Sequence, residues 1–237
     1  MRLIVTGAAI VSVLVNNVDA GIAKMTTDLS LLVARNSSLW SDRSITNILS
    51  QFPNIIENYG CWCFFDDNHG KGKGRPVNDI DKICKETAHA YDCAIMDAEN
   101  DAGQPSCTPW TSNYISGISQ GLDGLVSQCD TNNVDPCANA ACKIEGRFVL
   151  SFFSMFLLSG NSIDPTYQDG NAASSFDPVV DCLMTPGQTD KDRECCGEQP
   201  HRYKFKPFNG GNACCGSTVY PTMIQQCCPD NVPRVTC

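Results

Sequence analysis

The chain has 237 residues, of which 16 are cysteine, and a formal net charge of -9 at pH 7. An even, heavy cysteine load is typical of a secreted protein with a disulfide framework, here up to eight bridges. The C-x-C and CC spacings argue against zinc. A uniform negative charge repels phosphate backbones and anionic lipid surfaces, which excludes nucleic acid as an expected partner.

The first twenty residues have the form of a secretory signal peptide. Arg2 supplies the positive charge, residues 3–15 are mostly apolar, and Ala20 or Ala23 offers the small residue before cleavage. No later apolar run reaches the roughly 20 residues that a membrane helix needs. The sequence therefore predicts a secreted, extracellular protein without a transmembrane segment.

The cysteines fall into two groups. Eight lie in residues 61–142 and eight in residues 182–237, and the stretch between them is rich in Gly, Ser, Asp and Pro. We expect a first unit at residues 21–160, a linker at 161–177 and a cysteine-rich tail at 178–237. The tail is too small to rely on its own core, so its disulfides must stabilise it.

Four segments of the first unit carry helical patterns, so this unit is expected to be mainly α. Residues 44–51 form a short amphipathic segment, and residues 79–96 place apolar side chains every three or four positions. Residues 115–129 give a weaker pattern that glycines interrupt. Residues 137–158 give the strongest pattern, with small residues followed by an aromatic stripe that we expect to lie in the core.

The tail has a different pattern, with turn residues between short β-prone runs at 203–205 and 218–220. Adjacent cysteines seldom bond to each other because the ring between them is strained. Each CC pair should therefore reach two different partners. The sequence predicts a small, irregular, disulfide-rich unit of hairpins and turns.

A motif of cysteines, glycines and carboxylates begins at Tyr59. Its residues are Tyr59, Gly60, Cys61, Trp62, Cys63, Gly74, Pro76, Asp81, Cys84 and Cys93. In this motif the chain resembles the secreted phospholipase A2 family, over roughly residues 40–158. The resemblance implies disulfide-braced helices, a histidine that activates water, and calcium held by an adjacent aspartate and loop carbonyls.

The catalytic His-Asp dyad that this resemblance implies is not found in register. Counting from Cys84 places the dyad at Thr87 and Ala88. Counting from Cys93 places it at Ala90 and Tyr91 instead. Neither register finds a histidine or an aspartate.

His89 and Asp92 are the nearest candidates for a catalytic pair. They are three residues apart on the expected helix and can be neighbours there. His89 lies about 200° around the helix from Thr87, so we expect it to point away from the family's catalytic face unless a local bulge turns it back. His69 and His201 lie in loops and are expected to be solvent-exposed.

The expected calcium loop also departs from the family because residues 64–75 make it longer. Trp62, Phe64, Asp66 and Asp67 are the candidate ligands, through backbone or carboxylate oxygens of the kind that calcium prefers. The sequence leaves two interpretations open, a rearranged calcium site or a solvated acidic turn.

The tail adds a second resemblance. Its pattern Cys214-Cys215-Gly216, Tyr220-Pro221 and Cys227-Cys228 is similar to the CC repeat of galaxins, secreted matrix proteins of calcifying animals. This similarity implies an extracellular binding or assembly role.

Two functions are compatible with these patterns. The first is a non-catalytic scaffold of the phospholipase A2 type that binds phospholipid or extracellular matrix components. The alternative is a divergent calcium-dependent phospholipase A2 that hydrolyses phospholipid esters with His89 and Asp92. The absence of the dyad in register favours the first.

Overall fold

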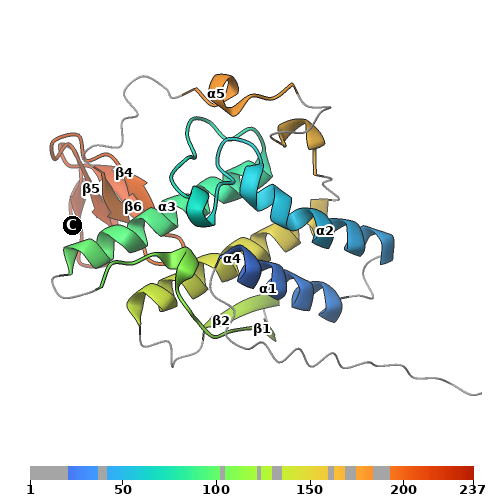
Figure 1. Cartoon of the computed structure of the whole chain (residues 1–237). Helices are drawn as coiled ribbons and strands as arrows, with labels where there is room; N and C mark the ends of the chain where they lie inside the picture. Colours follow the sequence, from blue (N-terminus) through green and yellow to red (C-terminus); the bar gives the residue numbers. More distant parts are fainter. Residues whose placement is uncertain are drawn as a thin grey trace, which may run out of the picture.

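The computed structural model shows a helical body with a small β-rich tail (Figure 1). It describes residues 21–36, 42–101, 105–121, 124–129, 135–159, 163–168, 175–183 and 193–237. The expected signal peptide lies outside these residues, and the expected linker lies partly outside them. The fold class expected from the sequence, α first and small hairpins at the end, is confirmed.

Four long helices form the body. They are α1 (Ile22–Arg35), α2 (Asp42–Asn58), α3 (Asp79–Asn100) and α4 (Pro136–Ser159). α3 and α4 pack along each other, and α1 packs on α2 and α4. The helices expected at 44–51, 79–96 and 137–158 lie within α2, α3 and α4, so these three are confirmed.

The hydrophobic core lies between these helices. The aromatic stripe of α4 is part of it, as expected, because Phe148, Phe152 and Phe153 are buried. The core also includes α1, which the sequence patterns above do not include. Met25, Leu29 and Leu32 are fully buried, and their spacing of three or four is a helical signal.

The helix expected at residues 115–129 is wrong. This segment forms an antiparallel hairpin of β1 (Ser116–Gly121) and β2 (Gly124–Cys129), in which Ser116 pairs with Cys129. Glycine costs up to about 1 kcal/mol in a helix interior, and this segment holds three glycines. The Cys129–Cys142 disulfide ties the hairpin to α4.

Short elements complete the chain. The 3-10 turns are η2 (Asp66–Asn68), η3 (Pro109–Thr111) and η4 (Pro165–Tyr167), and α5 (Pro178–Asp181) is a single helical turn. The tail strands are β3 (Glu194–Cys196), β4 (Tyr203–Phe205), β5 (Asn212–Cys215), β6 (Thr218–Pro221), β7 (Gln226–Cys227) and β8 (Pro233–Arg234). They pair as three antiparallel hairpins, which confirms the expected tail structure.

All sixteen cysteines are paired. The disulfides are Cys61–Cys182, Cys63–Cys84, Cys93–Cys195, Cys107–Cys137, Cys129–Cys142, Cys196–Cys214, Cys215–Cys227 and Cys228–Cys237. Each CC pair reaches two different partners, as expected. Two bridges, those of Cys182 and Cys195, join the C-terminal region covalently to the helical body.

Over the described ranges, no helix is both long and apolar enough to cross a bilayer.

The bridge between α3 and the tail can be tested by removing it. The variant Cys93→Ser/Cys195→Ser should lose roughly 2–4 kcal/mol of unfolding free energy, and the β3–β4 amides should lose protection from hydrogen exchange. The control Cys228→Ser/Cys237→Ser also removes one bridge but leaves β3–β4 tied to α3. Equal protection of β3–β4 in both variants would show that the bridge does not hold the hairpin in place.

Candidate functional site

The loop that follows Tyr59 is fixed to the start of α3 by Asp81. The buried Asp81 carboxylate accepts hydrogen bonds from the backbone N–H groups of Cys61, Trp62 and Val77, at 2.9, 2.7 and 2.9 Å. Burial raises the pKa of this carboxyl, although the three backbone donors act against it. The Cys63–Cys84 disulfide adds a covalent link between the same loop and α3. The loop and α3 therefore form one rigid frame.

The two residues in the Cys84 register of the expected dyad are both buried. Thr87 is 5 % exposed, and its hydroxyl donates to the Ile83 carbonyl at 2.9 Å. Ala88 is 6 % exposed and carries no functional group. In the alternative register, Ala90 and Tyr91 are also buried. Neither register places a general base on α3.

A buried carboxylate occupies the centre of the body, on α4. Glu145 accepts hydrogen bonds from the hydroxyls of Tyr91 and Tyr114 at 2.8 and 2.7 Å. It also accepts from the backbone N–H of Gly21, at 3.0 and 2.8 Å to its two oxygens. Burial raises the pKa of Glu145 to about 7, although these donors lower it. The sequence signal for this site is one acidic residue on the apolar face of α4.

A His-Asp pair does exist, but it joins Asp92 to His69 of the loop. His69 Nε2 lies 2.8 Å from Asp92 Oδ1, and the other Asp92 oxygen forms an ion pair with Lys204 of β4. Burial raises the pKa of Asp92, but the His69 hydrogen bond and the Lys204 ammonium lower it more, so the pKa lies below its usual value. Asp92 is thereby committed to two partners.

The expectation that His69 is solvent-exposed is wrong. Its side chain is only 7 % exposed. The ring packs at 4.6 Å from the Trp110 ring and at 5.6 Å from the Tyr91 ring, measured between centroids. A long loop folds the ring inward because these two aromatic side chains offer it an apolar surface. His201, by contrast, is exposed as expected.

His89 lies apart from this pair. Its ring stands edge-on to the Trp62 ring, with 5.2 Å between centroids, and its Nε2 atom is buried with no hydrogen-bond partner in the described part of the chain. Burial, followed by the charges of Lys204 and Lys85, lowers the pKa of His89 to about 4. His89 is therefore neutral at pH 7.

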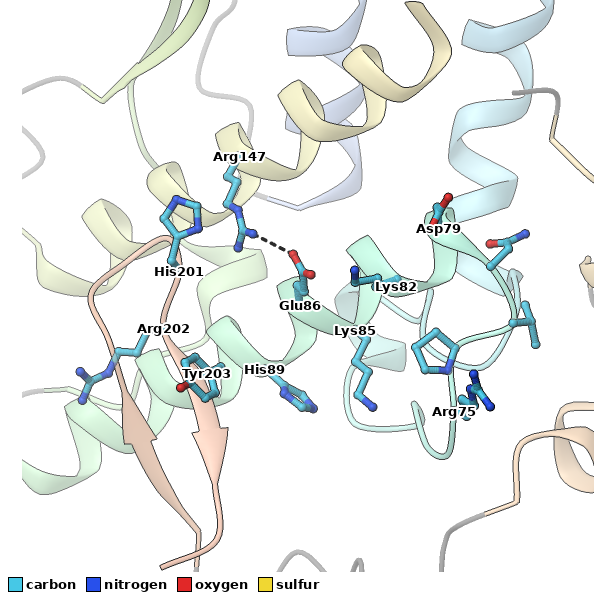
Figure 2. Close-up of a pocket in the computed structure, with 13 residues that line it drawn as sticks. Arg75, Asp79, Lys82, Lys85, Glu86, His89, Arg147, His201, Arg202 and Tyr203 are labelled. Carbon is cyan, nitrogen blue, oxygen red and sulfur yellow. Dashed lines mark hydrogen bonds and ion pairs between the residues drawn. The ribbon is translucent and has the colours of Figure 1, made fainter. Parts of the chain in front are cut away.

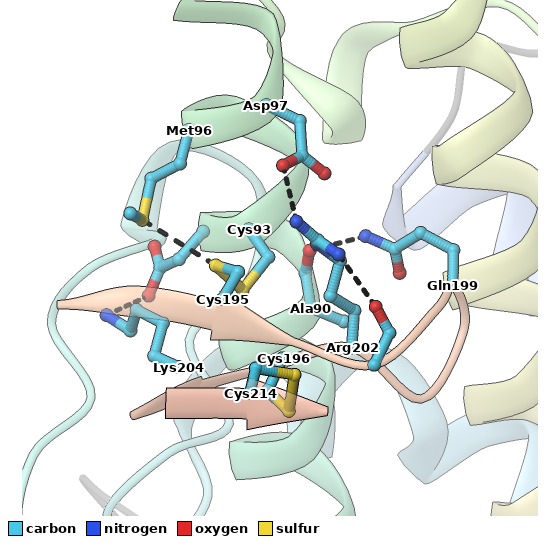
Figure 3. The surroundings of a disulfide bond; sticks show 12 residues. Ala90, Cys93, Met96, Asp97, Cys195, Cys196, Gln199, Arg202, Lys204 and Cys214 are labelled. Carbon is cyan, nitrogen blue, oxygen red and sulfur yellow. Dashed lines mark hydrogen bonds and ion pairs between the residues drawn. A yellow bond between two sulfur atoms is a disulfide. The ribbon is translucent and has the colours of Figure 1, made fainter. Parts of the chain in front are cut away.

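The tail hairpin β3–β4 is fixed across α3 by several contacts besides the Cys93–Cys195 bridge (Figure 3). The Gln199 side chain donates to the Ala90 carbonyl at 3.1 Å, and Arg202 pairs with Asp97 at 2.8 Å. From α4, Arg147 donates to the Pro200 carbonyl at 3.2 Å. The hairpin is therefore part of the same frame as the loop and α3.

A groove of about 770 Å³ runs along α3 between this hairpin and the loop (Figure 2). Its lining carries five cationic side chains and two carboxylates, namely Arg75, Lys82, Lys85, Arg147, Arg202, Asp79 and Glu86. This volume is that of a typical small-ligand site. The uniform negative charge assumed from composition is therefore a poor description of this face, which is locally positive.

Known proteins with sequences similar to this chain are phospholipases A2. No family model matches the chain. "Acidic phospholipase A2 3" of Naja sagittifera is 30% identical over 125 residues, which cover 47% of this chain and 85% of the relative. The chain belongs to the phospholipase A2 family. "Acidic phospholipase A2 E" of Naja oxiana is 30% identical over 118 residues, covering 44% and 83%, and "Basic phospholipase A2 DE-1" of Hemachatus haemachatus is 29% identical over 117 residues, with the same coverage.

The candidate calcium ligands of this phospholipase A2 family member do not converge. The Asp66 carboxylate faces the start of α1, where it accepts the Ile22 N–H at 3.2 and 3.4 Å, and burial raises its pKa to about 6. Asp67 is exposed. The Trp62 carbonyl accepts the Phe64 N–H at 2.9 Å. Across the described ranges, no three His, Cys, Asp or Glu side chains gather in a way that could hold a metal ion.

The surroundings of Ala88 also do not fit calcium. A cavity of about 310 Å³ lies there, lined by one carboxylate, that of Asp92, and by the cations Lys73, Lys85, Arg193 and Lys204. Calcium needs six to eight oxygen ligands. A site with one committed carboxylate and several cations repels a divalent cation instead.

The similarity of these relatives to the chain does not test the galaxin-like pattern of the tail, which stays a prediction.

The role of Asp92 can be tested with Asp92→Asn, which should lower the unfolding free energy by about 2 kcal/mol at pH 7. Because the folded pKa of Asp92 lies below 3.8, wild type keeps this advantage above about pH 4 and loses it as pH falls through the folded pKa. Denaturant titrations over pH measure the difference. The control Asp97→Asn breaks a more exposed pair and should cost less than about 1 kcal/mol. An Asp92→Asn deficit that persists unchanged at low pH would contradict the ionic account.

The Gly21 contact favours one of the two expected cleavage sites. Cleavage after Ala20 would free a positive amino group beside both oxygens of Glu145, whereas cleavage after Ala23 would remove that partner and the first residues of α1. We therefore expect the secreted protein to begin at Gly21. N-terminal sequencing checks this, and a mature chain that begins at Lys24 would overturn it.

Proposed function

We propose that this phospholipase A2 family member is an extracellular protein that binds phospholipid without hydrolysing it. The observation that carries the proposal is the pair Thr87 and Ala88, which stands in the Cys84 register of the family's dyad. A general base must reach the proton it removes and must have a pKa near the working pH. A threonine hydroxyl committed to the Ile83 carbonyl and an alanine methyl meet neither condition.

Binding of phospholipid is supported by two further observations. The relatives are phospholipases A2 by name, so the scaffold is one that accepts phospholipid in other proteins. The groove along α3 offers cationic side chains to a headgroup. An extracellular location is supported by the eight disulfides, which form and persist in oxidising compartments.

Hydrolysis remains a second candidate function because of one observation. The buried His69–Asp92 pair lines the cavity beside Ala88, and a histidine oriented by an aspartate is a recurring general base. Two features weigh against it. Asp92 is shared with Lys204, and His69 Nδ1 is buried without a hydrogen-bond partner in the described part of the chain.

A paired assay separates the two functions. Purified protein is mixed with vesicles of phosphatidylcholine and phosphatidylserine in calcium, then vesicle binding is measured by co-sedimentation and hydrolysis by free fatty acid. We expect binding, with fatty-acid release at the level of protein-free vesicles.

Two variants identify the base if release is found. Calcium-dependent release that His69→Gln abolishes and His89→Gln retains would establish the second candidate function. Release that only His89→Gln abolishes would assign catalysis to His89 and Asp92, as expected for a divergent enzyme. Either result would overturn the non-catalytic proposal.

A further inference from the structure

We propose that the groove along α3 is a binding site for a phosphate group, carried by a phospholipid headgroup or by a soluble phosphate ester, and that the tail hairpin builds one of its walls. The inference deepens the proposed phospholipid binding and in its lipid form rests on it. Its experiment is therefore chosen so that the two can fail separately.

The first support is a set of cations for which the described residues provide no ion pair. Arg75 and Lys82 are exposed, and neither forms an ion pair over the described residues. Lys85 forms a long hydrogen bond, 3.4 Å, to the Gly74 carbonyl and lies 4.8 Å from the Trp62 ring centroid. The Asp81 carboxylate attracts Lys85 but is hydrogen-bonded to three backbone N–H groups. Figure 2 shows these three side chains along the groove. Cations that line one groove and form no ion pair over the described residues are suited to an anion.

The carboxylates of the groove do not cancel this charge. Glu86 forms an ion pair with Arg147 at 2.7 Å, so these two side chains neutralise each other. Asp79 is then the other carboxylate of the lining. The groove stays positive in a protein whose net charge is -9. A local field of this sign, opposed to the overall charge, selects anionic ligands at this one face.

A neutral side chain lies beside the cations. His89 lines the groove, and its Nε2 atom is buried with no hydrogen-bond partner within the described ranges. His89 therefore adds no charge to the groove. Lys85 and His89 each lie two residues from Thr87, about 200° around α3, and both also line the cavity beside Ala88, so the groove adjoins that cavity.

The tail supplies the other wall. His201 and Tyr203 of the hairpin line the groove, and the Cys93–Cys195 bridge and the Gln199 contact with Ala90 hold that hairpin on α3. The wall is fixed rather than hinged. A preformed wall of this kind lowers the entropy cost of binding.

The test measures two ligands, sn-glycerol 3-phosphate in solution and vesicles of phosphatidylcholine with phosphatidylserine. The variant Arg75→Glu/Lys82→Glu reverses two exposed charges of the groove and should weaken both interactions by about tenfold or more. The control Arg35→Glu/Lys143→Glu makes the same charge change on exposed residues of α1 and α4. It should retain wild-type affinity.

A second pair of variants tests whether the tail hairpin contributes one side of the groove. His201→Glu places a carboxylate on the tail side of the groove and should weaken both interactions, whereas Gln226→Glu adds the same charge to the exposed β7 strand. Equal binding by these two variants would overturn the contribution of the tail.

The remaining outcomes distinguish the proposed phosphate site from the proposed phospholipid binding. If Arg75→Glu/Lys82→Glu binds both ligands like its control, the groove is not the site and the proposal is wrong, while phospholipid binding stands. If wild type binds glycerol phosphate through the groove but no vesicles, the site stands and the proposed function fails. If wild type binds neither ligand, both are wrong.

Discussion

The Cys93–Cys195 disulfide is the constraint on which the rest of the site depends. It joins residues 102 positions apart and fixes the β3–β4 hairpin against α3. Once the hairpin is there, Lys204 reaches Asp92, and His201 and Tyr203 become a wall of the groove. The hairpin therefore adds to the helical body an ion-pair partner for Asp92, the carboxylate that lines the cavity beside Ala88. It also adds a second side to the cationic groove.

The two faces of α3 lie in different environments. The inner face, with Thr87 and Tyr91, is packed in the core, and its polar groups are satisfied by a backbone carbonyl and by Glu145. The outer face, with Lys82 and Lys85, is left to solvent and to the groove. In this phospholipase A2 family member Thr87, in the Cys84 register of the dyad, is buried, whereas Lys82 and Lys85 line the groove from the same helix.

Sequence patterns predict the parts of this fold that local rules control. The periodicity of α3 and α4 and the separate partners of each CC pair are visible because they depend on neighbouring residues. The hairpin at 115–129 is missed because the apolar residues of this short segment have a weak helical spacing. That spacing is given more weight than the glycines, which disfavour a helix. The burial of His69 and its bond to Asp92 cannot be read from sequence, since both depend on how a long loop folds onto α3. The groove is hidden for the same reason, because net charge says nothing of where the cations gather.

The most direct test of this account is a crystal structure grown with calcium and a short-chain phospholipid present. The account predicts the headgroup phosphate between Arg75, Lys82 and Lys85, with the ester bonds intact and no calcium beside Ala88. A calcium ion held by the loop next to Ala88, with the scissile ester directed at His69 or His89, would contradict the account. That result would show that this protein is a calcium-dependent phospholipase.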